Sequence, residues 1–241
     1  MKSRLKSIPL PQKSIEKYCI FPRYDSDYIT KQIYQYKKKE YREISTEPYD
    51  LASLFREKNK KLRKKVHVEV CCGTGDFITS IAAADPSISF IGVDYAMPAI
   101  LRAVKKSDAL GIENILFYTG RAEDFFLHDL KNTKFDRIYI NYPDPWPKKR
   151  HKRRRLIDHD FIANLLPCMK KGGMLSIASD SGEYVRDMIL CIADFKSLTS
   201  EHSQKNLTKP LLTEYIQYIS NYSEKASKSA KFTYYLLYKL K

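Results

Sequence analysis

Residues 66–85 read VHVEVCCGTGDFITSIAAAD, and this stretch decides the fold. A short β-branched run leads into a turn that carries Gly73 and Gly75, and a helical segment follows the turn. This order of strand, glycine turn and helix is typical of the first unit of a doubly wound α/β sheet. A dinucleotide-binding turn would carry a third glycine where Ile78 stands, so an NAD-dependent enzyme is the least favoured interpretation.

The alternation of strand and helix continues along the chain. Buried-type strands are predicted at 88–94, 114–120, 135–141 and 174–180, and a final strand is predicted at 232–240. One predicted helix stops at Gly111, and another, at 156–173, closes with the pair Gly172 and Gly173. Strands that alternate with helices imply a mostly parallel sheet with helices on both faces.

In such sheets, ligands bind beyond the carboxyl ends of the strands. The polar segments at or just after the predicted strand ends are therefore expected to line one crevice, although they are far apart in the sequence. These segments are Glu69–Gly75, Asp94, Arg121–Glu123, Asn141–Asp144 and Ser179–Asp180.

Composition favours a nucleic-acid partner. The 241 residues carry a formal net charge of +15, which favours a polyanion, with a membrane surface as the second choice. The five cysteines form no CxxC pair and the histidines show no ligand spacing, so we expect no disulfide framework and no metal. No apolar run reaches membrane-spanning length, and the N-terminus lacks a signal-peptide core. We expect a cytoplasmic protein that needs no membrane and no obligatory protein partner.

Residues 1–64 differ in composition and in periodicity from the rest of the chain. They are rich in lysine, interrupted by proline and weakly periodic. We expect a basic N-terminal extension that is partly disordered or helical, with a helix around 48–60 that carries Leu51, Leu54 and Phe55 on one side. The domain proper is expected to span 65–241.

Acidic residues follow three of the predicted strands. Glu69 lies beside the glycine turn, where it disfavours a pyrophosphate and favours a ligand with a positive group, such as the amino acid moiety of S-adenosylmethionine. Asp94 ends the second strand, where a carboxylate can accept both hydroxyls of a ribose or can cap the next helix. Glu123 or Asp124 could reach an adenine amino group, or both could be solvated acids in the first turn of a helix.

The motif NYPDPWPKKRHKRRR, residues 141–155, follows the fourth of these strands. Three prolines restrict the loop, so that Asp144 is held just past the strand end. Trp146 could stack on a base or pack in the core. The basic run is either a solvated helix face or a set of phosphate contacts, and its density favours phosphate. The residues expected to contact RNA phosphates are Lys149, Arg150, Lys152, Arg153, Arg154 and Arg155.

The motif PDPWPKKRHKRRR resembles the hallmark of bacterial tRNA (guanine-N7-)-methyltransferases, the TrmB family. EVCCGTGDF, FIGVD and LTEYIQYI agree with the same family in order and spacing, so the resemblance covers roughly 66–240. It implies a Rossmann-like class I methyltransferase with a mostly parallel seven-stranded sheet and an antiparallel C-terminal strand. It also implies S-adenosylmethionine as methyl donor, S-adenosylhomocysteine as product, and guanine N7 at tRNA position 46 as the target.

The resemblance assigns roles by position, with Asp144 as the catalytic residue. Together with the acids discussed above, the expected cofactor site consists of Glu69, Gly73, Gly75, Asp94, Arg121, Glu123 and Asp144. The expected site for tRNA or its guanine consists of Lys148, Asp180, Thr213, Glu214, Tyr215 and Ile216.

Three positions depart from the family pattern. Cys71 replaces the first glycine of the turn, Arg121 replaces an acid after the third strand, and Ile216 replaces a glutamate in the TxYE pattern. These departures keep two alternatives open: a non-catalytic RNA-binding protein with the same fold, and a methyltransferase that acts on another RNA guanine.

Overall fold

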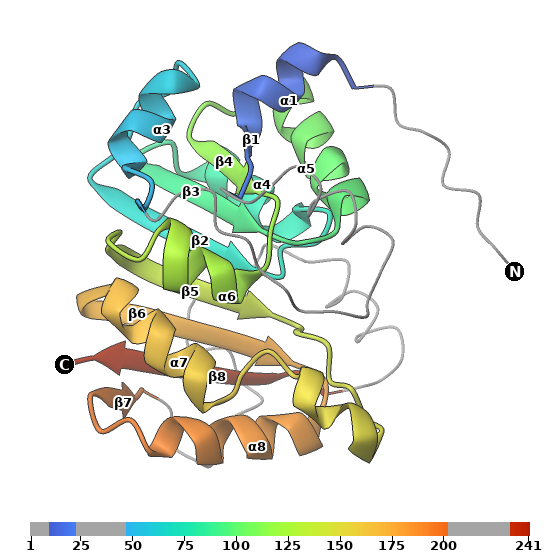
Figure 1. Ribbon diagram of the computed structural model, residues 1–241, viewed down its shortest axis with the longest axis vertical. Helices are drawn as coiled ribbons and strands as arrows, with labels where there is room; N and C mark the ends of the chain where they lie inside the picture. The colour runs from blue at the N-terminus through green and yellow to red at the C-terminus, as the bar shows by residue number, and fades with distance from the viewer. Residues whose placement is uncertain (1–9, 23–46, 202–231) are drawn as a thin grey trace, which may run out of the picture.

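A single sheet organises the molecule, seen in a computed structural model that describes residues 10–22, 47–201 and 232–241 (Figure 1). The described strands have the order β1-β4-β3-β2-β5-β6-β8-β7. Their bounds are β1 Cys19–Ile20, β2 Lys65–Val70, β3 Ile88–Val93, β4 Ile115–Tyr118, β5 Phe135–Asn141, β6 Met169–Ser179, β7 Leu198–Ser200 and β8 Tyr234–Leu240. Neighbouring strands pair in parallel except β8, which is antiparallel to β6 and β7. The predicted mostly parallel sheet with an antiparallel C-terminal strand is confirmed.

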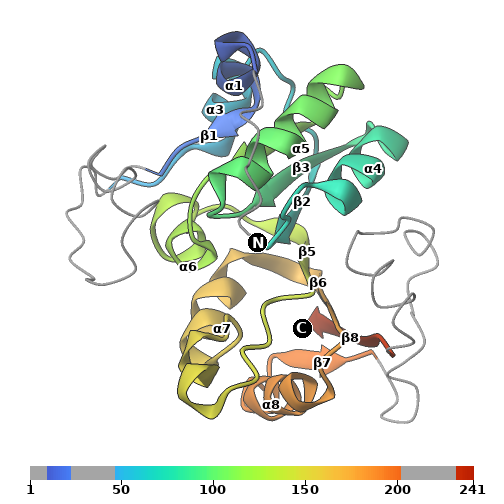
Figure 2. The same cartoon turned by 90° about the vertical axis from the view of Figure 1, so that its right-hand side faces the viewer.

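Helices cover both faces of this sheet. Their bounds are α1 Gln12–Tyr18, α3 Leu51–Glu57, α4 Asp76–Ala84, α5 Met97–Ala109, α6 Ala122–Asp124, α7 His159–Leu165 and α8 Gly182–Ala193. A π-helical turn, Phe125–Asp129, extends α6. Side chains of α3, α6, α7 and α8 share one buried cluster, while those of α1, α4 and α5 share the other. Figure 2 shows α4 and α5 on one side of the sheet and α6 and α7 on the other.

The N-terminal extension contributes to the sheet in its described part. Strand β1 lies beside β4 at one edge, and its preceding residue, Tyr18, is fully buried, as is Cys19. Ser14 donates a hydrogen bond to Asp108 (2.7 Å), which joins α1 to α5. The described sheet therefore has eight strands, one more than the seven that the resemblance implied. The short strands β1 and β7 have no counterpart among the strands predicted from the sequence pattern, because two or three residues give no periodic signal.

The glycine pair of the predicted helix 156–173 lies inside a strand instead. Helix α7 ends at Leu165, a short 3-10 turn with Pro167 follows, and β6 begins at Met169. The pairing of β5 with β6 shifts register at this point. A Cβ on Gly173 would lie 2.7 Å from the Lys170 carbonyl oxygen, so the pair permits a bulge and does not end a helix.

Other helix predictions agree with the structure. Helix α5 ends at Ala109, and Gly111 follows with a φ of 62°. Helix α3 begins after Asp50, whose side chain accepts a hydrogen bond from the Ser53 amide (2.8 Å). In the described part of the chain, no helix is both long and apolar enough to cross a membrane.

Candidate cofactor and nucleic-acid site

The centre of the site lies where the chain reverses its direction across the sheet. Strands β2, β3 and β4 extend to one side, and the chain then returns to place β5 on the other side of β2. In open α/β sheets, ligands bind at this point, outside the carboxyl ends of the strands. Those ends lie on the right in Figure 1 and face the viewer in Figure 2.

Glu69 and Asn141 meet across this point, near the ends of β2 and β5. Asn141 Nδ2 donates to Glu69 Oε1 at 2.9 Å, and the Glu69 side chain is almost fully buried, with 2% exposed. Glu69 Oε2 is also buried and has no hydrogen-bond partner among the described residues. Burial raises the pKa of Glu69 to about 8, although the Asn141 hydrogen bond and the backbone amide of Ile78 act in the opposite direction. A buried acceptor without a partner is costly, so a donor from a ligand would stabilise it.

The glycine turn follows Glu69 directly. Gly73 and Gly75 have φ values of 54° and 69°, in the left-handed region that glycine adopts without strain. A Cβ on Gly75 would lie 2.6 Å from Ala103 Cβ, so Gly75 lets the turn pack on α5. A Cβ on Gly73 would meet no atom within 4 Å, so its backbone borders open space that a ligand can enter. Cys71 also has a left-handed φ, 59°, and is therefore a strained replacement for glycine.

Asp94 joins the glycine turn to the start of α5. One carboxylate oxygen accepts from the Gly73 amide (2.9 Å), and the other accepts from the Ala96 amide (2.8 Å). The contact with Ala96 closes a turn before the helix and does not cap it, because the N-cap of α5 is Ala96 and has no side-chain cap hydrogen bond. It does not displace a ribose contact, because each carboxylate oxygen can accept a second hydrogen bond. Burial raises the pKa of Asp94, and the charge of Asp144 acts in the same direction.

Four of the acids expected in the crevice lie around one thiol. Burial raises the pKa of Cys71 well above its ordinary value, and nearby negative charges raise it further. Those charges belong to Asp94, Asp144, Glu123 and Glu69. Residues from four different strand ends therefore converge, as the strand-end rule predicted.

Glu123 has a partner within the chain. Arg121 Nη2 donates to Glu123 Oε1 at 2.5 Å, and both side chains are partly exposed. An adenine amino group would have to share this carboxylate with Arg121. The departure at position 121 thus places a positive charge beside the carboxylate of Glu123 at the predicted adenine end.

The PDPWP loop leaves β5 with an unusual backbone. Tyr142 and Trp146 have φ values of 50° and 40°, which are strained for residues other than glycine. Asp144 lies between them and is exposed. The centroid of the Trp146 ring lies 5.0 Å from the Arg154 guanidinium. The ring is also edge-on to His151, with 5.8 Å between the ring centroids. Trp146 therefore packs against the basic turn and not in the core.

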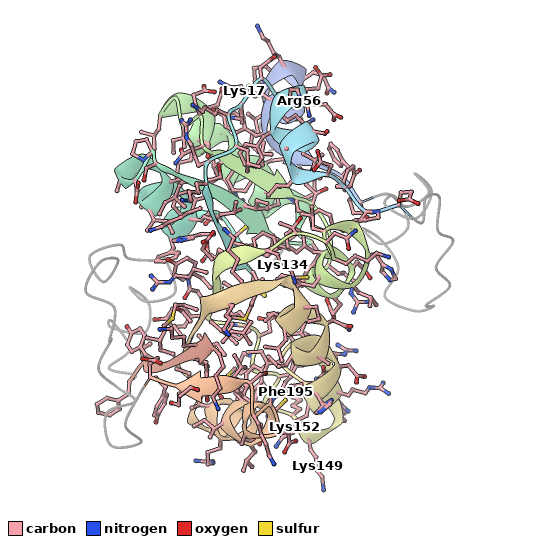
Figure 3. All side chains as sticks on the ribbon, turned by 90° about the vertical axis from the view of Figure 1, so that its left-hand side faces the viewer. Lys17, Arg56, Lys134, Lys149, Lys152 and Phe195 are labelled. Atoms are coloured by element: carbon pink, nitrogen blue, oxygen red, sulfur yellow. The ribbon has the colours of Figure 1, made fainter. Side chains whose placement is uncertain are left out.

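The basic run forms a 3-10 turn, Lys149–Arg154, rather than a longer helix. Lys148, Lys149, Arg150, Arg153 and Arg154 are exposed. Figure 3 shows Lys149 and Lys152 at the lower end of the molecule, with Lys149 directed away from the body.

Two members of the predicted phosphate set have acidic partners. Lys152 forms an ion pair with Glu183. Arg155 is 8% exposed and forms an ion pair with Asp187, also on α8. We therefore correct the prediction for Arg155: its buried guanidinium is not presented to an RNA backbone.

The remaining predicted residues have different positions. Asp180 follows β6 and is partly exposed near the same edge. The segment 213–216 lies outside the described residues. Asn141 was predicted from its strand-end position to line the ligand site, but its specific role, the hydrogen bond to Glu69, was not predicted. Among the described residues, no group of three or more His, Cys, Asp or Glu side chains could hold a metal ion.

Comparison with known proteins identifies the family. The family model Methyltransf_4, described as "Putative methyltransferase", matches residues 63–236. A tRNA (guanine-N(7)-)-methyltransferase of Nitrosococcus oceani is 30% identical over 196 residues, which cover 80% of this chain and 73% of that protein. This chain belongs to the tRNA (guanine-N(7)-)-methyltransferase family. The resemblance inferred from PDPWPKKRHKRRR is confirmed.

Other members of the tRNA (guanine-N(7)-)-methyltransferase family match over a shorter length. The enzyme of Neisseria meningitidis serogroup B is 35% identical over 63% of this chain and 61% of its own length. The Chlamydia muridarum enzyme is 31% identical, and the match spans only 58% of its length. A crystal structure of the 16S rRNA methyltransferase KamB has a TM-score of 0.57 at 13% identity, covering 84% of this chain and 96% of that one. The KamB likeness shows the predicted class I methyltransferase fold.

The residues of the site fit the cofactor that this family implies. S-adenosylmethionine carries an ammonium group, and the unpartnered Glu69 Oε2 is a buried acceptor for such a donor. The open space at Gly73 allows close approach to the backbone, and Asp94 borders that turn. The acids gathered around Cys71 also suit a ligand with positive charge better than a phosphate.

Proposed function

We propose that this protein transfers a methyl group from S-adenosylmethionine to N7 of guanine 46 in the variable loop of tRNA, which forms 7-methylguanosine. One observation carries the proposal: a single loop joins the acids that surround Cys71 to an exposed basic turn. The group of acids suits a cationic cofactor, and the turn suits the phosphates of RNA. The relatives named tRNA (guanine-N(7)-)-methyltransferase support the choice of substrate. The proposed setting is the cytoplasm, with no membrane and no second protein required.

Cofactor binding is assigned to the strand-end residues. When bound, S-adenosylmethionine supplies a methyl group on a sulfonium. Glu69 accepts from the ammonium group, and the turn at Gly73 and Gly75 brings the backbone close. Asp94 accepts from the ribose hydroxyls, while Glu123, shared with Arg121, lies at the adenine end. Because burial raises the pKa of Glu69, its carboxylate forms fully only when a positive partner is present or the pH is high.

Asp144 is assigned to the guanine. N7 of guanine has a lone pair and no proton, so no base is needed at this atom. The chain must instead hold the ring in position and stabilise the positive charge that develops on it. Asp144 carries a carboxylate on a loop restricted by Pro143 and Pro145, beside the other acids of the crevice. We assign it the stabilisation of the methylated, cationic ring.

Substrate RNA is assigned to the exposed basic turn and its neighbours. Lys149, Arg150, Lys152, Arg153 and Arg154 contact phosphates, with Lys152 exchanging its acidic partner for RNA. Lys148, Asp180 and the segment Thr213–Ile216 contact tRNA or the target guanine.

The test is methyl transfer from labelled S-adenosylmethionine to unmodified tRNA, followed by nucleoside analysis. We expect 7-methylguanosine at position 46. Asp144→Asn should lower kcat by a factor of roughly 100 while tRNA affinity changes little, because only the charge opposite the developing cation is removed. Equal losses in kcat and affinity would remove the catalytic role.

Two other results would redirect the proposal. A methylated guanine at another position would assign a different RNA target. Tight tRNA binding without S-adenosylmethionine binding would indicate a non-catalytic RNA-binding protein.

A further inference from the structure

Arg155 ends the basic run in sequence, but its environment differs from that of its neighbours. Arg150, Arg153 and Arg154 are exposed, whereas Arg155 is 8% exposed. A buried arginine in a segment that otherwise faces solvent is held there by specific contacts, because its charge must be compensated. The contacts of the Arg155 side chain therefore indicate its role.

The guanidinium of Arg155 connects the PDPWP loop with helix α8. Its Nε donates to the carbonyl oxygen of Pro145 at 2.7 Å. Its Nη1 donates to Asp187 on α8, and Nη2 lies 3.5 Å from Glu183 on the same helix. The central carbon of the guanidinium, Cζ, lies over the Tyr184 ring at 4.8 Å from the ring centroid. One side chain thus spans from the residue after Asp144 to three residues of α8.

Helix α8 provides a fixed support for this connection. Tyr184 is fully buried, and its hydroxyl accepts from the Ile157 amide at 2.8 Å, two residues beyond Arg155. Val185 and Met188 of the same helix belong to the core cluster. Arg155 therefore connects the PDPWP loop on the surface to a helix that is packed in the core.

The loop needs such external support. Tyr142 and Trp146 both have strained φ values, and backbone in these regions persists only where surrounding contacts hold it. At the start of the loop, the Tyr142 hydroxyl hydrogen-bonds to Thr233 (3.1 Å). At its other end, one residue after Asp144, the Pro145 carbonyl oxygen accepts a hydrogen bond from Arg155.

We propose that Arg155 is a positioning residue that holds Asp144 at the guanine site through the Pro145 carbonyl, rather than a residue that binds RNA. The inference rests on the proposed function and deepens it. Displacements of about 1 Å at a reacting group can cost roughly 100-fold in rate. We call the contacts of Arg155 with Pro145 and Asp187 the clamp. Its loss should therefore lower kcat and leave the tRNA affinity unchanged.

Arg155→Lys separates the two roles. Lysine keeps the charge, so a phosphate contact would survive, but it cannot donate to Pro145 and Asp187 with the fixed fork of arginine. We expect kcat to fall about tenfold or more, with the salt dependence of tRNA binding unchanged. Arg153→Gln is the matched comparison: it removes a proposed phosphate contact, so it should weaken tRNA binding and reduce its salt dependence.

Asp187→Asn tests the same clamp from the side of α8. The Asp187 side chain is 47% exposed, so this variant should fold even if Arg155 variants do not. It should lower kcat in the same direction as Arg155→Lys, and the double variant should lose less than the product of the two effects, because both remove one contact. Independent, multiplicative losses would contradict the clamp.

Trp146 offers a readout that does not depend on activity. It is the only tryptophan in the chain and lies on the clamped loop, so fluorescence excited selectively at tryptophan, and not at the 18 tyrosines, reports on this loop. Arg155→Lys and Asp187→Asn should increase acrylamide quenching at least twofold under conditions where circular dichroism shows a folded protein. Unchanged quenching and unchanged kcat in both variants would overturn the inference. Absence of methyl transfer by the wild type, with altered quenching in the variants, would instead count against the proposed function alone.

Discussion

The environment of Glu69 indicates the charge of the ligand that the site binds. The Glu69 carboxyl group is buried, Oε1 accepts a hydrogen bond from Asn141, and Oε2 has no hydrogen-bond partner in the described residues. Burying a charge is unfavourable unless it is paired, so the protein alone favours the neutral acid. A cationic ligand reverses this preference, which makes the site selective for positive charge.

Stability should depend on pH through this residue. The pKa of Glu69 is raised from an ordinary 4.5 to about 8, so the folded state holds a proton that the unfolded state has released between these values. The stability contribution is therefore complete below the lower pKa and is lost as pH rises through the higher one. Relative to Glu69→Gln, the wild type should lose up to roughly 1.4 kcal/mol of unfolding free energy per pH unit in this window.

Urea denaturation of both proteins between pH 5 and 9, about the range in which Glu69 titrates, measures this difference. The difference in unfolding free energy between the two proteins removes the contributions of the other titrating groups, because both proteins share them. A pH-independent gap between the two proteins would show that Glu69 is ionised in the folded state.

At the scale of elements, the turn between β2 and α4 combines a function with a conformational cost. Gly73 and Gly75 adopt left-handed backbone freely, whereas Cys71 does so with strain. Cys72, its neighbour, does not have a positive φ. These two adjacent cysteines therefore provide a comparison between a strained and an unstrained position.

Cys71→Gly should be more stable than Cys71→Ala by about 1 kcal/mol, because glycine removes the left-handed strain and alanine keeps it. At position 72 the order should reverse, with alanine the more stable, because glycine there adds only unfolded-state entropy. Chemical denaturation of the four variants measures both differences. The same order at the two positions would contradict the strain at Cys71.

Elements also show where sequence patterns were ambiguous. A glycine pair after an apolar helix predicted a helix end at 172–173, but Pro167 had already ended the helix and the glycines form an irregularity in β6. Both structures require glycine for backbone reasons, so the residue type did not distinguish them. Strand β1 was missed because its two residues are defined by pairing with β4, which the sequence does not encode locally.

At the scale of the whole molecule, charge is distributed between two opposite edges of the sheet. The basic turn lies near the carboxyl edge, which Figure 2 faces, while exposed lysines also occur at the amino edge, where Figure 3 shows Lys134. Net charge alone would treat both edges as equivalent. The proposed function predicts that only the first edge binds tRNA.

Neutralising Lys149, Arg150 and Arg153 together as glutamines should reduce the slope of log affinity against log salt by roughly two to three, because each phosphate contact releases less than one counterion. The control replaces Lys64, Lys131 and Lys171, which are exposed at the amino edge, and changes the net charge equally. Its slope should change little. Titrations of tRNA at several salt concentrations measure both, and equal changes would indicate a general charge effect in place of a defined interface.

The sequence by itself determined the alternation of strands and helices, the acids at their ends and the family, because these depend on local pattern and on one specific motif. The tertiary structure decided which of those residues meet and how. It brought Asn141 to Glu69 across neighbouring strands, and it placed Arg155 under the PDPWP loop rather than on the RNA face. Both outcomes depend on burial and on partners distant in sequence, and a run of like charges cannot reveal which member turns inward to meet an acid on another helix.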